Sequence, residues 1–165
     1  MSLHQPIAPV AGETILTDYL DCLSLIERLH RLLLDVVKDE FERLGVLEIN
    51  AVQALLLFHI GENEVTAGEL KTRGYYQGSN VSYNLKKLVE MGYMHHQRCE
   101  IDRRSVRVKL TDKGTEIRTI VADLFERHTE IFEKSATFGE TGMSTLNTSL
   151  KGMERFWIDQ IRYIY

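Results

Sequence analysis

The chain has 165 residues and a formal net charge of −4, enough for one domain with a core or for a domain extended by helices that need a partner. Its two cysteines, Cys22 and Cys99, argue against a disulfide scaffold and suit a reducing cytoplasm. The sequence begins without a signal-peptide pattern, and no apolar run approaches the roughly 20 residues that span a bilayer. We therefore expect a soluble, cytoplasmic protein that does not bind membranes.

A long N-terminal helix is the first predicted element. After a flexible start over residues 1–12, apolar residues recur every three or four positions over residues 13–45, which is the spacing of one helical face. Gly45 is expected to end this helix. A second helix, AVQALLLFHI, follows Asn50 as its N-cap and stops at Gly61. It is apolar on almost every side, so we expect it to be buried.

Two further short helices are predicted next. Thr66 and Glu69 have the T-x-x-E spacing of a capping box at the start of the first, which Gly74 closes. The second runs from about Ser79 to Met91, with an inward apolar stripe and a polar opposite face. The stripe is Val81, Leu85 and Leu88, and the polar face is Ser79, Ser82, Tyr83 and Lys86.

A two-stranded hairpin follows in the prediction. From Val106 to Leu110 apolar residues alternate with polar ones, which is the period of a half-buried strand. The segment YMHHQR supplies its partner strand, and CEIDRR supplies the turn. Thr111 is placed to cap another helix, and a last helix follows a loop around Gly139 and Gly142.

This order of elements predicts a mainly helical α+β fold, a winged helix-turn-helix over residues 46–112. The flanking helices, 13–45 and 113–165, have apolar stripes longer than so small a domain can cover alone. A closed two-fold dimer is the economical way to bury them, since it is the commonest oligomer. On the last helix we expect the dimer contacts to be Met143, Leu146, Leu150, Met153 and Trp157.

Charge is segregated along the sequence. Residues 71–113 hold ten Lys and Arg against four Asp and Glu, whereas the rest of the chain holds ten against twenty. A basic middle inside an acidic chain is the electrostatic footprint of a protein that meets a polyanion with one face. A solvated charged hairpin is the alternative, and charge alone does not separate the two.

The order of elements and three short motifs resemble the MarR family of bacterial transcription regulators, over roughly residues 13–132. The family motif L-T-x-x-Q is matched by Ile49, Asn50 and Gln53. The longer family motif, D-x-R-x-x-x-V-x-L-T-x-x-G, is matched by Asp102 and Arg104 and by the SVRVKLTDKG that follows. Within the family, SNVSYNLKKLVEMGYMHHQR most resembles the alphaproteobacterial LdtR-type regulators of cell-wall L,D-transpeptidase genes.

The resemblance implies a dimeric, sequence-specific regulator that binds a pseudo-palindromic operator in double-stranded DNA and regulates cell-wall or stress genes. It places the family's minor-groove arginine at Arg104, with Asp102 as the acid that orients it. The chemistry agrees, because an arginine at a hairpin tip can enter a narrow minor groove while a carboxylate holds its guanidinium group. The alternative is an ordinary surface ion pair.

Further DNA contacts are predicted on the hairpin, where Arg103 and Arg107 can reach phosphates, and on the preceding helix. There the sequence matches the family's S-x-V-T-R at Ser79, Val81 and Ser82. It departs from the motif at Tyr83, where a long cation is common, so the base code stays open. A small polar helix start is equally a good N-cap. The predicted helix contacts are Ser79, Asn80, Ser82, Tyr83, Lys86 and Lys87.

The resemblance also implies a small-molecule effector and a pocket where the dimer helices meet the DNA-binding lobe. Leu55 and Phe58 are three positions apart and share a helical face, with His59 beside them. We expect these residues to line a pocket suited to an aromatic or weakly acidic ligand. The alternative is that they are ordinary core residues.

Catalysis is not expected. His95 and His96 are adjacent, so on a strand they point to opposite faces and cannot share a metal. The sequence has no nucleophile motif and no phosphate-binding glycine loop, so we predict no enzyme activity, cofactor or metal site. Two alternatives stay open: a nucleoid-type protein without a specific operator, and a redox sensor that uses Cys22 or Cys99. The position of Cys22 beside the apolar stripe favours core packing.

Overall fold

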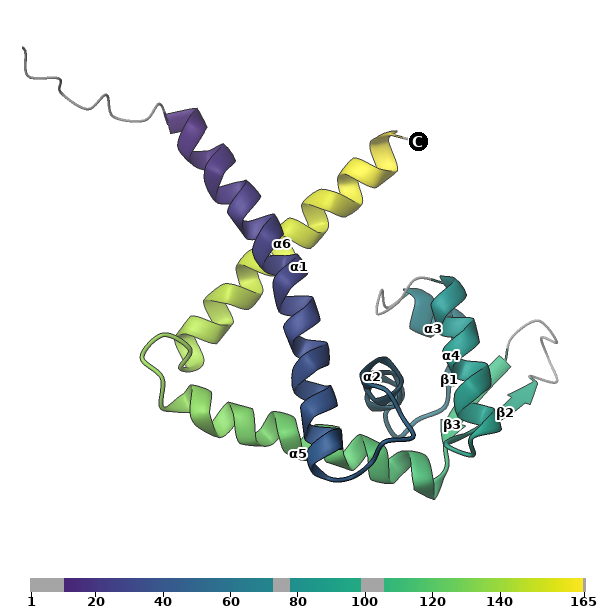
Figure 1. Ribbon diagram of the computed structural model, residues 1–165. Coiled ribbons are helices and arrows are strands. Elements are labelled where there is room, and N and C mark those ends of the chain that lie inside the picture. Colours follow the sequence, from purple (N-terminus) through teal and green to yellow (C-terminus); the bar gives the residue numbers. More distant parts are fainter. Residues whose placement is uncertain (1–10, 73–77, 99–105, 165) are drawn as a thin grey trace, which may run out of the picture. The chain divides into compact units, whose positions relative to one another are not determined.

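A computed structural model describes residues 11–72, 78–98 and 106–164. Within these ranges the chain forms six helices and a three-stranded sheet, shown in Figure 1. The helices are α1 (Ala11–Arg43), α2 (Ala51–Ile60), α3 (Ala67–Thr72), α4 (Gly78–Glu90), α5 (Asp112–Glu133) and α6 (Glu140–Ile164), and the strands are β1 (Val65–Thr66), β2 (Met94–Arg98) and β3 (Val106–Leu110). The predicted fold class, mainly helical with a winged helix-turn-helix, is confirmed. None of the helices in the described ranges has both the length and the apolar character needed to cross a bilayer.

The chain divides into two compact units, Met1–Arg118 and Thr119–Tyr165, with the boundary inside α5. The first unit contains the whole winged helix-turn-helix, and the second contains the rest of α5 together with α6. The functional limits predicted from the sequence, at residues 12, 45 and 112, stay predictions.

α1 begins at Ala11, two residues earlier than predicted, which is within the ordinary uncertainty of a helix boundary. It ends at Arg43, and Gly45 follows with a φ of 74°. The Val46 amide donates to the Phe41 carbonyl at 2.9 Å, and the Gly45 amide donates to Glu42 at 3.0 Å. The left-handed conformation of Gly45 lets these two amides donate to carbonyl groups at the helix end, so Gly45 terminates α1 as predicted.

Two capping boxes fix the starts of α2 and α3. Asn50 Oδ1 accepts from the Gln53 amide at 2.8 Å, and Gln53 Oε1 accepts from the Asn50 amide at 3.2 Å. Thr66 Oγ1 accepts from the Glu69 amide at 3.0 Å, while Glu69 Oε2 accepts from the Thr66 amide at 2.7 Å. Both predicted caps are therefore present, and α2 ends before Gly61, whose φ is 72°.

The sheet has one strand more than the hairpin that the sequence predicted. Its order is β1-β3-β2, with both pairs antiparallel, and Val65 and Thr66 of β1 pair with Val108 and Arg107 of β3. A strand of two residues is too short to show a period of two, so the pattern of the sequence does not reveal it. β1 ties the segment before α3 to the outer edge of the hairpin.

The core of the first unit lies between the helices and the sheet. α2 is buried on most sides, as predicted, with Leu56 1% and Leu57 0% exposed. The predicted stripe of α4 also faces inward. The core residues contributed by α4 and the sheet include Val81, Leu85, Leu88, Met94 and Val108.

The turn before α6 is shorter than predicted. α6 begins at Glu140, so Gly142 lies inside its first turn and not in a loop. A Cβ atom on Gly142 would lie 2.1 Å from the Thr137 carbonyl oxygen. Position 142 must therefore be glycine, because a side chain there would clash with the Thr137 carbonyl group. A glycine needed for such a close contact looks the same in the sequence as a glycine in a loop, so Gly142 was predicted as a loop residue.

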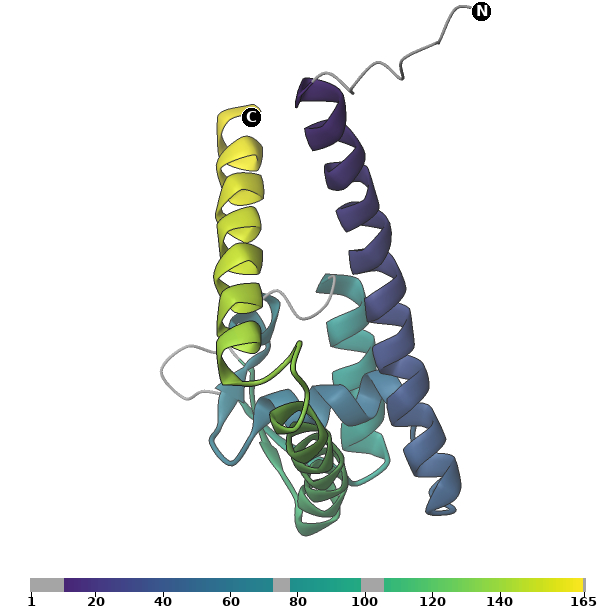
Figure 2. The ribbon, with the colours of Figure 1, turned by 90° about the vertical axis from the view of Figure 1, so that its left-hand side faces the viewer.

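The N-terminal part of α1 projects beyond the other elements of its unit, as Figures 1 and 2 show. Near its C-terminal end α1 buries Val37 and Phe41, which are 0% and 3% exposed. Toward its N-terminus the apolar side chains are exposed. They include Ile15, Leu16, Leu20, Leu25 and Leu29.

Candidate nucleic-acid interface

The outward face of α4 carries the helix contacts predicted from the sequence. Val81 and Leu88, 1% and 0% exposed, anchor the inner face, and Tyr83 on the outer face is 61% exposed. Asn80 is exposed, and its carbonyl accepts from Asn84 Nδ2 at 2.9 Å. The remaining exposed candidates are Ser82, Lys86 and Lys87. Ser79 lies in the first turn of α4, but its side chain is outside the described part of the chain.

Both lysines of this face are paired with one carboxylate at the end of the helix. Glu90 Oε2 lies 3.6 Å from Lys87 Nζ, and Glu90 Oε1 lies 3.9 Å from Lys86 Nζ. All three side chains are largely exposed, and exposed pairs of this kind are worth about 0–1 kcal/mol. A phosphate can therefore replace Glu90 at either lysine at small cost.

The predicted contacts of the hairpin are only partly described. Arg107, on β3, is exposed, and its Nη1 lies 3.8 Å from Glu64 Oε2 just before β1. Strand β1 thus places an acid beside the wing cation. Asp102, Arg103 and Arg104 lie outside the described residues, so their proposed roles in DNA binding stay predictions.

A polar brace that the sequence did not reveal holds the base of the wing. The Tyr93 ring is 0% exposed, and its hydroxyl donates to Glu48 Oε1. Lys113 Nζ lies 3.0 Å from the same oxygen and 4.2 Å from the centroid of the Tyr93 ring. The Lys113 ammonium also donates to the Met91 carbonyl at 3.3 Å. The brace thus joins the α1–α2 loop, the turn after α4 and the first turn of α5.

The electrostatics of the brace follow from these contacts. The hydrogen bond from Tyr93, followed by that from Lys113, lowers the pKa of Glu48. Burial, reinforced by the hydrogen bond to Glu48 and its charge, raises the pKa of Tyr93. Tyr93 therefore stays protonated and Glu48 stays ionised at neutral pH, which is the combination that the hydrogen bond requires.

The segment LTDKG contributes to this brace through Thr111, Lys113 and Gly114. Thr111 Oγ1 donates to the Gly92 carbonyl at 2.7 Å and accepts from the Gly114 amide at 3.1 Å, so Thr111 caps α5 as predicted. A Cβ atom on Gly114 would lie 2.1 Å from the Tyr93 carbonyl oxygen. α5 can therefore dock on the turn after α4 only if this position is glycine. The LTDKG segment could have indicated the brace, but Glu48, which pairs with Lys113 and Tyr93, lies far away in the sequence.

The predicted effector residues lie on α2. Leu55 is 4% exposed, whereas Phe58 and His59 are half-buried, with ring centroids 5.6 Å apart in an edge-to-face arrangement. Burial lowers the pKa of His59, so its neutral form is favoured. Leu55 is a core residue in this chain, and the pocket stays a prediction.

The predicted dimer contacts lie along α6. Leu146 and Leu150 are each 42% exposed, while Met143, Met153 and Trp157 are half-buried. Other large apolar side chains of α6 are also exposed. They are Phe156, Ile158, Ile161 and Tyr163. So much apolar surface on one helix is typical of an interaction face.

The histidines and cysteines do not gather into a metal-binding cluster within the described ranges. His95 and His96 are exposed on β2, and no group of three or more His, Cys, Asp or Glu in the described residues is arranged to hold a metal ion. Cys22 is a half-buried free thiol in α1. Cys99 lies outside the described residues, so the redox alternative is not decided.

Comparisons with known proteins agree with this geometry. Residues 49–114 match a family model described as a winged helix DNA-binding domain. Over 164 residues the chain is 32% identical to the exopolysaccharide II synthesis transcriptional activator ExpG of Rhizobium meliloti (strain 1021), covering 98% of this chain and 82% of that protein.

Solved structures of two DNA complexes share the fold. Streptococcus pneumoniae FabT in complex with DNA aligns with a TM-score of 0.67 and 20% identity, over 86% of this chain and 99% of that one. A putative MarR family transcriptional regulator from Listeria monocytogenes, complexed with a 26mer DNA, aligns with a TM-score of 0.72 and 20% identity, over 86% and 92% of the two chains.

Proposed function

Because this chain belongs to the MarR family of winged-helix, DNA-binding transcription regulators, we propose that it acts as a homodimer on a specific operator under the control of a small-molecule effector. The observation that carries the proposal is the outward face of α4. It presents Asn80, Ser82, Tyr83 and two weakly held lysines beside a wing, on a helix anchored by buried residues.

In this proposal α4 enters the major groove and the wing reaches the adjacent minor groove. Asn80 can read an adenine edge, and Ser82 and Tyr83 can meet a phosphate or a thymine methyl group. Lys86 and Lys87 exchange Glu90 for phosphates. Arg104, oriented by Asp102, is proposed to enter the minor groove, where the negative potential is strongest.

The exposed apolar faces of α1 and α6 support the homodimer. Side chains such as Leu20 and Leu29 on α1, and Leu146 and Leu150 on α6, are exposed by 42% to 60% in the single chain. A two-fold dimer presents two α4 helices and therefore requires a pseudo-palindrome with half-sites about ten base pairs apart.

The relative ExpG offers a first class of target genes. Its name assigns it to the activation of exopolysaccharide II synthesis, and it is 32% identical to this chain. We propose genes for an extracellular or cell-envelope polysaccharide as the first targets to test. The LdtR-type cell-wall target inferred from sequence stays a second prediction.

Footprinting on DNA upstream of the chain's own gene tests the proposal. We expect a protected pseudo-palindrome, bound by a dimer, with an affinity that falls steeply with salt. If each subunit neutralises about four phosphates, the slope of log K against log salt is about −7. Weak protection that ignores sequence would contradict operator recognition and favour the nucleoid-type alternative.

A further inference from the structure

A well-ordered turn, residues 91–93, joins α4 to the wing. Gly92 has a φ of 81°, and its amide donates to the Val89 carbonyl at 3.0 Å. The Tyr93 amide donates to the Leu88 carbonyl at 2.9 Å. These two bonds close the end of α4 as a Schellman motif, which fixes the direction in which the chain leaves the helix. The turn therefore sets the orientation of α4 relative to β2.

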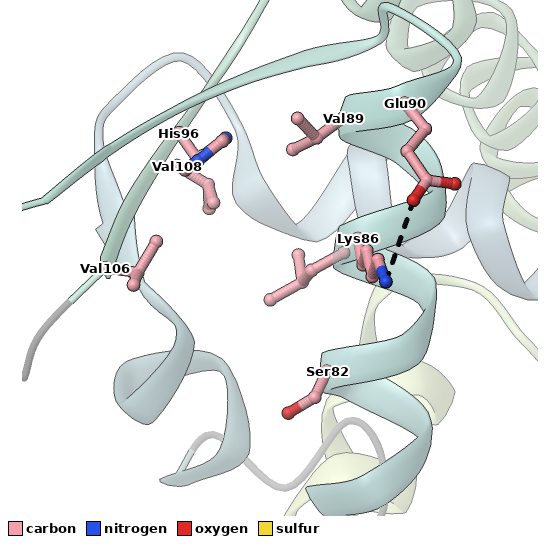
Figure 3. A pocket seen from close by; sticks show the side chains of 8 residues that line it. Ser82, Lys86, Val89, Glu90, His96, Val106 and Val108 are labelled. Atoms are coloured by element: carbon pink, nitrogen blue, oxygen red, sulfur yellow. Dashed lines mark ion pairs between the residues drawn. The ribbon is translucent and has the colours of Figure 1, made fainter.

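An aliphatic groove of about 460 Å³ lies between α4 and the strands, as Figure 3 shows. Val89 on the helix faces Val106 and Val108 of β3 across this groove. Side chains that line a groove restrain two elements less than side chains in a close-packed core do, because they make fewer contacts. This open part of the interface leaves more of the restraint to the turn.

The start of α5 is hydrogen-bonded to each of the three carbonyl groups of the turn. Lys113 Nζ donates to the Met91 carbonyl at 3.3 Å, and Thr111 Oγ1 donates to the Gly92 carbonyl at 2.7 Å. The Thr111 amide donates to the Tyr93 carbonyl at 3.1 Å. Bonds to three successive carbonyls prevent the turn from rotating on α5. The turn and the start of α5 therefore move as one body.

Glu48 adds the end of α1 to this body. It lies in the loop between α1 and α2, accepts from the Tyr93 hydroxyl, and has its Oε1 3.0 Å from Lys113 Nζ. The side chains of Glu48 and Lys113 are 57% and 45% exposed, and ion pairs at such positions add little to folding stability. The Tyr93 ring is 0% exposed, so it holds its hydroxyl in a fixed place. The carboxylate thus contributes orientation more than stability.

We propose that Glu48 and Lys113 are positioning residues, which together with Tyr93 fix the direction of α4 and the wing relative to α1. The consequence for DNA rests on the proposed function. Because α1 carries part of the apolar face proposed for the dimer, the angle at this joint sets the distance between the two α4 helices of a dimer. The joint therefore selects the spacing of the half-sites in the operator.

Double electron–electron resonance measures the joint in the full chain without DNA. Nitroxide labels are placed at Arg31→Cys on α1 and His95→Cys on β2, two exposed positions. The parent protein for labelling carries Cys22→Ser and Cys99→Ser. Excess unlabelled protein keeps the measured pairs within one chain, so the distance does not depend on the dimer.

The labelled parent should show one narrow distribution of distances. Glu48→Ala and Lys113→Met should each broaden it, because α4 and the wing then adopt a range of angles to α1. If the two residues form one joint, the double variant should be no broader than either single variant. Unchanged widths in both single variants would overturn the proposal.

Glu62→Ala is the matched control. Glu62 is also an exposed glutamate that follows a helix and pairs with a cation of α5, but its partner Arg118, at 3.4 Å, lies farther along α5 than Lys113. This variant should keep the distribution of the parent. Broadening by Glu62→Ala equal to that by Glu48→Ala would show a general response to the loss of a surface carboxylate and overturn the assignment. Circular dichroism verifies that every variant is folded.

Operator affinity separates positioning from charge. Glu48→Ala removes a negative charge, so electrostatics alone predicts tighter DNA binding. The proposal predicts the reverse, with binding about fivefold weaker, because only the fraction of molecules with the correct angle binds. Glu62→Ala removes the same charge away from the joint and should bind at least as tightly as wild type. Tighter operator binding by Glu48→Ala would contradict positioning.

Operators with the half-site spacing changed by single base pairs supply a readout that lost stability does not move. A variant that is merely less stable loses affinity for every operator by the same factor, because only its folded fraction falls. Glu48→Ala should instead lose affinity for the preferred spacing and little for the neighbouring ones, so its preference should flatten. An unchanged preference would refute the selection of half-site spacing.

The joint and the proposed function fail in different ways. Broadened distances in Glu48→Ala, without any sequence-specific DNA binding by wild type, would refute the proposed function and keep the joint. Operator binding by wild type, with unbroadened distances in Glu48→Ala and Lys113→Met, would refute the joint and keep the proposed function.

Discussion

Helices α2 and α6 are both rich in apolar residues, but only α2 hides them within its own unit. Leu57 of α2 is 0% exposed, whereas Leu150 of α6 is 42% exposed. The same residue type thus serves two purposes. Apolar surface covered by the chain itself stabilises the folded chain, while a stripe left uncovered is available for association. These two leucines permit a matched comparison by the same substitution.

Leu57→Ala should have the largest effect. It deletes a fully buried side chain from α2 and leaves a cavity, so the free energy of unfolding should fall by about 2–5 kcal/mol. Urea denaturation should show the same loss at two well-separated protein concentrations. A loss that depended strongly on concentration would place Leu57 at an interface between subunits and erase the contrast with α6.

Leu150→Ala should weaken association more than folding. In the proposed dimer the substitution removes an apolar contact from each subunit, so the free energy of dimerisation should fall by about 1–3 kcal/mol. Analytical ultracentrifugation should show a raised dissociation constant with unchanged circular dichroism. Gly152→Ala, on the same helix, is the control variant, and its dissociation constant should stay near the wild-type value. Monomeric wild-type protein at micromolar concentration would contradict the dimer itself.

Tyr93→Phe is an intermediate case, because the ring is buried while its hydroxyl reaches the exposed Glu48. The variant keeps the apolar packing and loses one hydrogen bond, so its loss of stability should be smaller than that of Leu57→Ala. The folded-state pKa of Glu48 is lowered, so its contribution is present above the unfolded pKa and is lost as pH falls through the folded one. Wild type and variant should therefore converge in acid, and a constant difference down to strongly acidic pH would refute this account.

His59 should give the smallest effect. Burial lowers the pKa of this half-buried side chain of α2, so the unfolded chain takes up a proton before the folded one does. Stability is therefore full above the unfolded pKa, about 6.5, and falls as pH drops below it. His59→Gln should flatten this part of the pH profile of Tm. A profile that stayed as steep in His59→Gln as in the wild type would exclude His59 as the cause.

Local spacing predicted the parts of this fold whose partners are close in sequence. The caps at Asn50 and Thr66 and the inward stripe of α4 depend on residues three or four positions apart. β1 was missed because two residues show no period, and Gly142 was misread because its role is a close approach to Thr137. The brace at Tyr93 was missed because Glu48 lies 45 residues away.

The candidate site was predictable to the same degree. The outward face of α4 follows from helical spacing, so the exposure of Ser82, Tyr83 and Lys86 was predicted. The pairing of Arg107 with Glu64 was not, because it depends on the unpredicted strand β1. The aliphatic groove beside α4 also combines residues of a helix and a strand, and no single periodic pattern contains both.

The contact of Gly114 with the Tyr93 carbonyl has a consequence for protein engineering. Replacing glycine by alanine inside a helix usually raises Tm, because alanine restricts the unfolded chain and favours the helix. Gly152 in α6 suits that strategy, since a Cβ there meets nothing within 4 Å. Gly114 also lies in a helix, but its Cβ would lie 2.1 Å from a backbone oxygen. A thermostabilised version of this chain should therefore carry alanine at position 152 and retain glycine at 114.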